Sequence, residues 1–149
     1  MTIKNTIEEA IEETKKILQK KEEVSAAYLF GSIAKGNYRA NSDIDIAILF
    51  IPAMTKLERF EKRLELMGHI EDVAQRSADV IDLLEAPLFL QHQIRKYGKL
   101  IIEKDKAYRI DQEVRSRREY FDLMPHLERR QKAIIKDFLE KRGKENGRS

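Results

Sequence analysis

The sequence predicts a single α/β or α+β domain, in which a mixed sheet is flanked by helices and followed by a C-terminal helical extension. Three observations predict this class. The chain has 149 residues, 42% of them hydrophobic, which suits one domain with its own core. Short apolar runs of strand type alternate with segments of helical periodicity up to residue 105. Beyond that residue, apolar positions recur at helical spacing.

The first part of the chain predicts a helix, a strand, a polar loop and a second strand. Apolar residues at helical spacing, with glutamates between them, predict an opening helix within residues 1–21. Residues 24–30 form an apolar run that is too short for a helix, so we expect a buried strand. After the polar segment 31–42, the nearly continuous apolar run 44–51 predicts a central strand that is covered on both faces.

The following segments continue this alternation. Apolar residues between Leu57 and Val73 predict a long amphipathic helix. The pattern then predicts a third strand at 79–84, a helix from Pro87 to Tyr97 and a fourth strand at 99–103. This order of elements favours a mixed sheet, with the second and third strands on either side of a long helix in the sequence.

Residues 106–149 differ from the rest of the chain in charge. They contain 13 Lys and Arg against 8 Asp and Glu, a net +5, whereas residues 1–105 contain 16 against 18, a net −2. An apolar stripe, interrupted or begun at Pro125, predicts a long helix with one apolar face. We therefore divide the domain into a main body, 1–105, and a helical extension, 106–149, that docks on the body or on a partner chain.

Composition excludes several classes of function. The absence of cysteine excludes disulfides and thiolate metal sites, and no two of the three histidines have metal-ligand spacing. No segment approaches the roughly 18 apolar residues of a membrane span, so we expect a cytoplasmic protein without membrane contact. The net charge of +3 is small, and carboxylates are interspersed in the basic tail, so nucleic acid is not the expected partner.

The stretch between the first two strands carries the residues that are suited to catalysis. Gly31 follows a strand, where the lack of a Cβ lets the backbone turn and approach a ligand closely. Ser32 offers a hydroxyl and an amide at the start of a short helix, whose N-terminus favours anions. Asp43 and Asp45 lie two apart at the start of a strand, so both carboxylates project from the same face.

The Gly-Ser pair and the Asp-x-Asp pair indicate a function only in combination. Separately, a Gly-Ser pair after a strand or an Asp-x-Asp pair is usually a turn. Here they combine as Gly-Ser-x10-Asp-x-Asp, with a strand on each side. Neighbouring carboxylates repel one another unless cations lie between them, and Mg²⁺ takes oxygen ligands while keeping positions for phosphate oxygens. A phosphate site opposite a Mg²⁺ site predicts chemistry on a nucleotide polyphosphate.

At these residues the sequence resembles the minimal nucleotidyltransferases of the DNA polymerase β superfamily. Beyond the motif, the chain resembles the MNT antitoxins that are paired with HEPN ribonucleases. The segments that carry this second resemblance are Ala78–Leu83, Ala86–Leu88, Ile94, Gly98, Leu100–Glu103, Tyr120–Leu123 and the Arg-rich helix after them. The resemblance implies a polymerase β-like nucleotidyltransferase fold.

The resemblance also implies the roles of the site residues. The Gly-Ser pair would bind the triphosphate of ATP, and Asp43 and Asp45 would hold two Mg²⁺ ions. The family uses a third carboxylate from the neighbouring strand. Counting back without a gap from the later matching segments places it at Asp79, with Asp82 as the alternative. Since these two project from opposite faces of a strand, only one of them completes the site.

The activity that the resemblance implies is transfer of AMP from ATP to a tyrosine of the HEPN ribonuclease, which neutralises this toxin. The extension 106–149 would then dock the toxin. Two alternatives remain at this point. One is a non-catalytic antitoxin that blocks the HEPN toxin sterically, and the other is a nucleotidyltransferase that acts on another acceptor.

Overall fold

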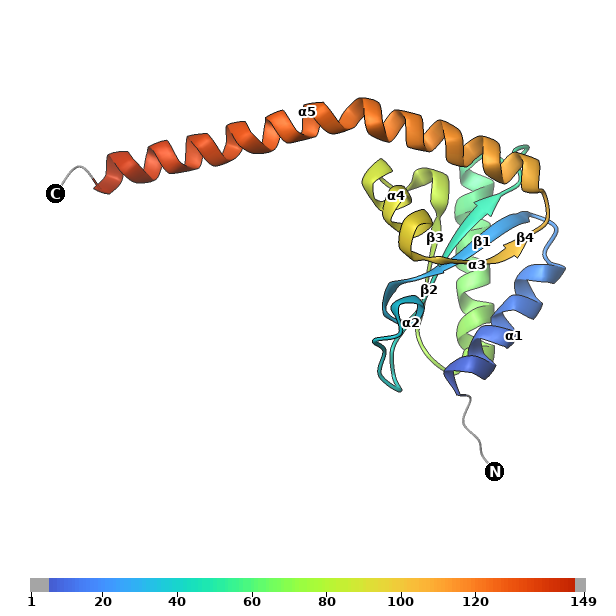
Figure 1. Cartoon of the computed structure of the whole chain (residues 1–149). Helices are drawn as coiled ribbons and strands as arrows, with labels where there is room; N and C mark the ends of the chain where they lie inside the picture. The colour runs from blue at the N-terminus through green and yellow to red at the C-terminus, as the bar shows by residue number, and fades with distance from the viewer. Residues whose placement is uncertain (1–5, 147–149) are drawn as a thin grey trace.

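The structure, a computed structural model, describes residues 6–146, which form a four-stranded sheet with helices on both faces (Figure 1). The elements are α1 (Ile7–Lys20), β1 (Val24–Phe30), α2 (Gly31–Lys35), β2 (Ile44–Phe50), α3 (Lys56–Ala74), β3 (Ala78–Asp82), α4 (Leu88–Tyr97), β4 (Lys99–Glu103) and α5 (Lys106–Asn146). The strand order is β3-β2-β1-β4. β1 is antiparallel to β2 and β4, whereas β2 and β3 are parallel. The predicted mixed α/β class with a C-terminal helix is confirmed.

Two apolar cores lie on opposite faces of this sheet. The larger core joins α1 and α3 to one face and includes Ile46 and Val80. The smaller core joins α4 to the other face and includes Ala47 and Ile94. As predicted, β2 is covered on both faces. Because successive side chains of a strand point to opposite faces, Asp45 lies on the face that α4 covers.

The element boundaries differ from the predictions at two places. The predicted third strand is too long, since β3 ends at Asp82 and residues 83–85 form a short 3-10 turn in which Leu83 is buried. The opening helix is observed from Ile7, and the first five residues of the prediction lie outside the described residues. A capping box at Thr6 fixes this helix start, because its hydroxyl accepts from the Glu9 amide over 3.1 Å.

α5 is one helix of 41 residues that runs through Pro125, so the predicted interruption or start at this proline is wrong. Proline removes one backbone N–H from the helical ladder and bends a helix without having to end it; Figure 1 shows α5 bent along its length. The first part of α5 packs on α4. Residues 122–146, the free half of α5, lead away from the sheet (Figure 1). No helix within residues 6–146 is long and apolar enough to cross a membrane.

Candidate active site

Three carboxylates meet at one end of the sheet. Asp43 precedes β2, Asp45 is the second residue of β2, and Asp79 is the second residue of β3. Asp45 and Asp79 are register partners in the parallel pair, so their side chains lie next to each other on the α4 face. The structure therefore brings together all three predicted carboxylates.

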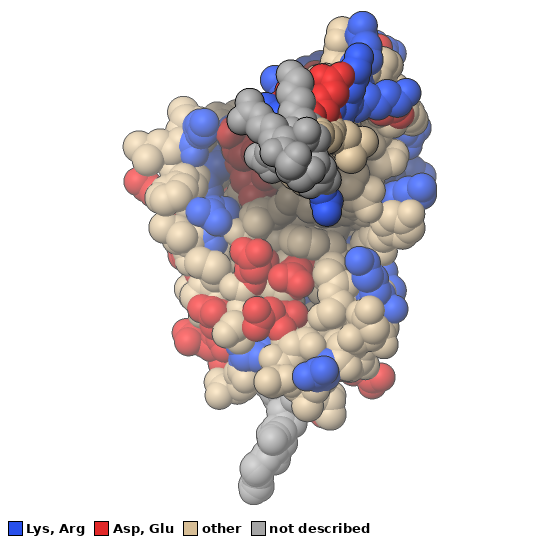
Figure 2. All heavy atoms as spheres, turned by 90° about the vertical axis from the view of Figure 1, so that its left-hand side faces the viewer, with Lys and Arg blue, Asp and Glu red and all other residues tan. Residues whose placement is uncertain are grey.

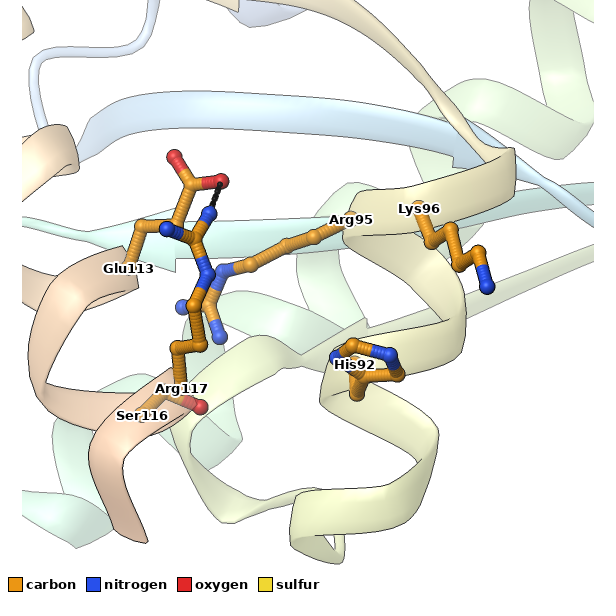
Figure 3. Close-up of a pocket in the computed structure, with 6 residues that line it drawn as sticks. All are labelled: His92, Arg95, Lys96, Glu113, Ser116 and Arg117. Carbon is orange, nitrogen blue, oxygen red and sulfur yellow. Dashed lines mark hydrogen bonds and ion pairs between the residues drawn. The ribbon is translucent and has the colours of Figure 1, made fainter. Parts of the chain in front are cut away.

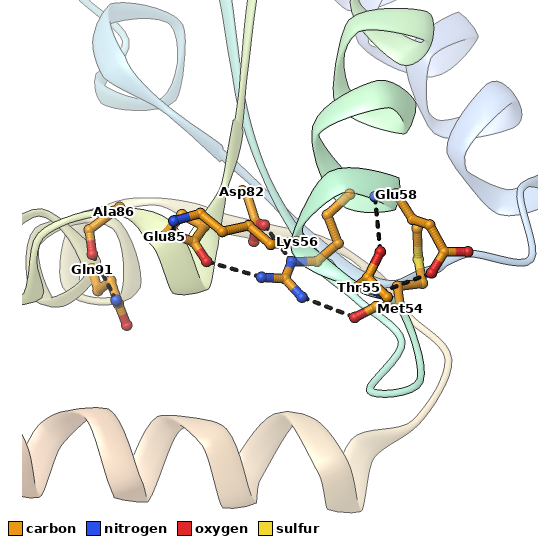
Figure 4. A network of polar contacts seen from close by, with 9 residues as sticks. Met54, Thr55, Lys56, Glu58, Asp82, Glu85, Ala86 and Gln91 are labelled. Atoms are coloured by element: carbon orange, nitrogen blue, oxygen red, sulfur yellow. Dashed lines mark hydrogen bonds and ion pairs between the residues drawn. The ribbon is translucent and has the colours of Figure 1, made fainter.

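Asp82 has a different environment. It lies on the opposite face, against α3, and is buried with 8% exposure. The Nε of Arg59 donates to its Oδ2 over 2.6 Å, and the other end of the same guanidinium donates to Glu85 over 2.9 Å. Figure 4 shows Asp82 and Glu85 in this network, together with Met54, whose carbonyl also accepts from Arg59. Asp82 thus belongs to a partly buried ion pair with α3, and it lies on the face opposite Asp45 and Asp79.

Gly31 lies directly against the central carboxylate. It follows Phe30, the register partner of Asp45, and begins α2 with a φ of +77°. Only glycine adopts this left-handed conformation without strain. A Cβ at this position would also overlap Oδ2 of Asp45. Ser32 is the next residue and lies half-buried in the first turn of α2. The Gly-Ser pair and the carboxylates are therefore parts of one site.

An arginine outside the motif binds the loop that leads to Asp43. Nη1 of Arg76 donates to the Ala40 carbonyl over 2.9 Å and to the Ser42 carbonyl over 3.3 Å. Within the loop, the Ser42 hydroxyl accepts from the Arg39 amide over 2.8 Å. Arg76 lies just beyond α3 and was not predicted as a site residue. Its contact spans 34 residues of sequence, so no local pattern could have indicated it.

The three carboxylates repel one another. Partial burial, followed by the charges of Asp79 and then Asp43, raises the pKa of the Asp45 carboxyl from 3.8 to about 6. Figure 2 shows Asp and Glu side chains gathered in the middle of the face that lies on the left in Figure 1, the side toward which α5 extends. This concentration of negative charge predicts a cationic ligand.

The donor set fits Mg²⁺. All three side chains offer oxygen atoms, which hard divalent cations prefer, and Asp43 and Asp79 are exposed and accessible to a ligand. Within residues 6–146, no three Asp, Glu or His side chains are already gathered around one point as a metal site. The two exposed side chains would have to rotate toward Asp45 to share a cation, and a bound cation would offset the repulsion among the three carboxylates.

Asp45→Asn is expected to stabilise the free protein at neutral pH. The folded-state pKa of Asp45 lies above its unfolded value, so its ionisation costs stability as pH rises from about 4 to about 6. Because much of the side chain is in solvent, screening reduces the expected gain to about 1 kcal/mol, a rise in Tm of about 2–4 °C. Thermal unfolding of the variant and the unchanged protein in EDTA, at pH 7.5 and at pH 4, measures this difference in Tm. The gain should disappear at pH 4, and an equal gain at both pH values would contradict the repulsion.

Fold and site together define a nucleotidyltransferase. Residues 12–107 match the family model described as polymerase beta nucleotidyltransferase, and the chain belongs to this family. It is 30% identical over 115 residues to the protein adenylyltransferase MntA of Shewanella oneidensis, which covers 75% of this chain and 74% of that relative.

Two crystal structures of toxin–antitoxin complexes are similar to the chain. One contains AMP-PNP; it shares 28% sequence identity with a TM-score of 0.61 and covers 85% of this chain and 98% of the matched chain. The other is the MntA–HepT pair, at 25% identity and a TM-score of 0.58, covering 87% of this chain and 97% of the matched chain. The predicted polymerase β-like fold and the predicted nucleotidyltransferase family are therefore confirmed.

Proposed function

We propose that this protein transfers AMP from ATP to a tyrosine of a HEPN ribonuclease toxin and thereby neutralises the toxin. The observation that carries this proposal is the pairing of Asp45 with Asp79 on one sheet face, with Gly31 in contact with Asp45. The similarity to MntA, a protein adenylyltransferase, supports a protein acceptor. The similarity to a toxin–antitoxin complex that holds AMP-PNP supports an adenine nucleotide as the donor.

Each residue of the candidate site has a separate role in the proposed nucleotidyl transfer. Asp43 and Asp45 would hold two Mg²⁺ ions, and Asp79 would hold the second of them. Mg²⁺ bound here would neutralise the phosphate oxygens and favour the ionised form of the acceptor hydroxyl. Ser32 and the neighbouring amides would bind the outgoing pyrophosphate. In the reaction, the tyrosine oxygen forms a bond to the α-phosphorus, the bond from that phosphorus to pyrophosphate breaks, and Asp79 assists removal of the phenol proton.

The free half of α5 is the proposed docking element for the toxin. Its large apolar side chains are exposed, including Ile134, Ile135, Phe138 and Leu139, which are 57–63% exposed. Exposed apolar side chains at helical spacing are typical of helices that bind a partner. α5 extends toward the same side of the sheet on which α2, the helix that begins at Gly31, lies (Figure 1). A toxin bound to this helix would be held in front of the site. The proposed organisation is thus a catalytic body, 1–105, and a docking extension, 106–149.

Intact mass spectrometry of the cognate HEPN toxin tests this proposal. After incubation with this protein, ATP and Mg²⁺, we expect mass increments of AMP on the toxin. The double variant Asp43→Asn/Asp45→Asn should bind the toxin without adding mass, and Asp111→Asn, an exposed carboxylate of α5, should behave like the unchanged protein. Tight binding without added mass by every version would favour a steric antitoxin instead.

A second variant separates docking from chemistry. Ile135→Glu/Phe138→Glu places two charges on the apolar face of the free half of α5. We expect this variant to lose the complex with the toxin in size-exclusion chromatography, and to modify the toxin slowly. Retention of the full complex would show that the free half of α5 is not the docking element.

A further inference from the structure

A basic cavity lies between α4 and α5, apart from the catalytic carboxylates. It has a volume of about 180 Å³. Each helix contributes three residues at helical spacing, and Figure 3 shows all six: His92, Arg95 and Lys96 from α4, and Glu113, Ser116 and Arg117 from α5. The cavity lies where α5 packs on the main body, shortly before the free half of α5 begins.

The charges that line this cavity are not balanced. Arg95, Lys96 and Arg117 are three cations, and Glu113 is the one carboxylate among the six lining residues. Glu113 is already engaged, because one of its oxygens accepts from Arg117 over 2.9 Å and the other from Arg109 over 3.0 Å. The cavity therefore has an excess of positive charge that its own carboxylate does not neutralise.

The guanidinium of Arg95 includes a buried donor that has no partner among the described residues. Burial lowers the pKa of Arg95, and the nearby charge of Arg117 lowers it further, whereas Tyr28 and Glu113 act in the opposite direction. One terminal nitrogen donates to Gln91 over 3.3 Å, but this amide oxygen also accepts the Ser116 hydroxyl over 2.8 Å. Within the described residues, the buried Nε of Arg95 has no hydrogen-bond partner. Its Nε is therefore a buried donor without a partner beside a second guanidinium, and such a charged donor is unfavourable unless an anion is bound.

We propose that this cavity binds a phosphate group, held mainly by Arg95 and Arg117. Guanidinium groups bind phosphate oxygens through paired N–H donors, which suits two arginines that face one cavity. Lys96 adds a third positive charge. His92 forms one wall, and its ring stacks on that of Tyr120 with centroids 4.5 Å apart, so a flat surface adjoins the phosphate site. Inorganic phosphate, pyrophosphate and the phosphate of AMP share the chemistry that this site recognises.

A phosphate bound here would connect the two helices. It would contact α4 through Arg95 and α5 through Arg117, close to the point where the free half of α5 leaves the domain. Occupancy is therefore expected to stabilise the packing of α5 on the main body. This inference does not depend on the acceptor of the proposed reaction, because none of the lining residues belongs to the catalytic site.

Thermal unfolding with inorganic phosphate tests the site. At about 10 mM phosphate, in EDTA and at constant ionic strength set with chloride, we expect a rise in Tm of about 2–4 °C. Arg117→Gln should weaken phosphate binding at least about fivefold in calorimetry, because it removes one of the two charged donors. Arg115→Gln is the matched control, since Arg115 is equally charged, lies on the same helix and does not line the cavity. An equal loss of phosphate affinity in both variants would show that phosphate is attracted by positive charge in general, and it would overturn the proposal.

A crystallographic soak with tungstate, a heavy phosphate analogue, shows where the anion binds. We expect an anomalous peak between Arg95 and Arg117, and a peak only at Gly31 and Ser32 would overturn the site. Asp43→Asn/Asp45→Asn should keep phosphate binding, so failure of the catalytic proposal leaves this result unchanged. Calorimetry with AMP and with inorganic phosphate then distinguishes the possible sources of the bound phosphate group. Tighter binding of AMP indicates a nucleotide, and equal binding indicates the free anion.

Discussion

Gly31→Ala is expected to lower the rate of AMP transfer by at least about 100-fold, because displacement of reacting groups by about 1 Å costs this much. Two physical effects act together. The φ of +77° at Gly31 is strained for any residue with a Cβ, and the added methyl group would overlap Oδ2 of Asp45. Either the carboxylate rotates out of the site or β1 and β2 separate at the register pair of Phe30 and Asp45. Both outcomes displace the central carboxylate. The rate of toxin modification at saturating ATP measures the effect.

Gly36→Ala is the matched control for this substitution. Gly36 also has a positive φ, of +81°, and ends α2, but a Cβ there would have no atom within 4 Å. The two variants therefore share the cost of a left-handed alanine, about 1 kcal/mol, and differ in the contact with Asp45. We expect Gly36→Ala to keep most of its activity. If both variants lose activity equally, the shape of the loop matters and the contact with Asp45 does not.

Much of this site could be predicted from the sequence, because its parts have local signatures. The apolar run 24–30 ends at a glycine, and the run 44–51 begins beside two aspartates, so both strand ends and their polar residues are visible in the chain. The sequence left both Asp79 and Asp82 open as the third carboxylate, whereas the structure places Asp79 beside Asp45 and Asp82 on the other face. Which face of β3 meets the site depends on the register with β2, and register is set by packing between distant segments.

Features that arise from contacts between distant elements were not predicted. Arg76 supports the loop before Asp43 from the far end of α3, and the cavity between α4 and α5 forms only when the two helices pack. Pro125 illustrates a different limit. Local rules favour the end of a helix at proline, but an exposed helix can bend and continue, because water satisfies the backbone carbonyl that loses its donor.

Asp79→Asn is expected to lower activity with little effect on stability, whereas Asp82→Asn is expected to lower stability with little effect on activity. Asp79→Asn should lower the transfer rate by about 1,000-fold, since a positioned proton acceptor contributes on this order. Its effect on stability should be small or slightly favourable, because Asp79 is exposed and repels Asp45. Asp82→Asn removes the buried counter-charge of Arg59, although Glu85 still contacts this guanidinium. Loss of a charged hydrogen bond of this kind costs about 2 kcal/mol, a fall in Tm of about 4–8 °C in a chain of this size.

Parallel measurements of rate and Tm on both variants distinguish the two aspartates, provided that the rates are measured well below the melting temperature of Asp82→Asn. Under those conditions we expect Asp82→Asn to retain activity within about threefold, because a change confined to the α3 face leaves the positions of the reacting groups unaltered. The pKa of Asp45 is an independent measure of which aspartate lies close to it. NMR titration of the free protein should show it lower in Asp79→Asn than in the unchanged protein, since the charge of Asp79 is part of what raises it. Asp82 is not among the groups that raise this pKa, so Asp82→Asn should leave the pKa of Asp45 unchanged. A lower Asp45 pKa in Asp82→Asn, together with loss of transfer, would instead place Asp82 at the catalytic site.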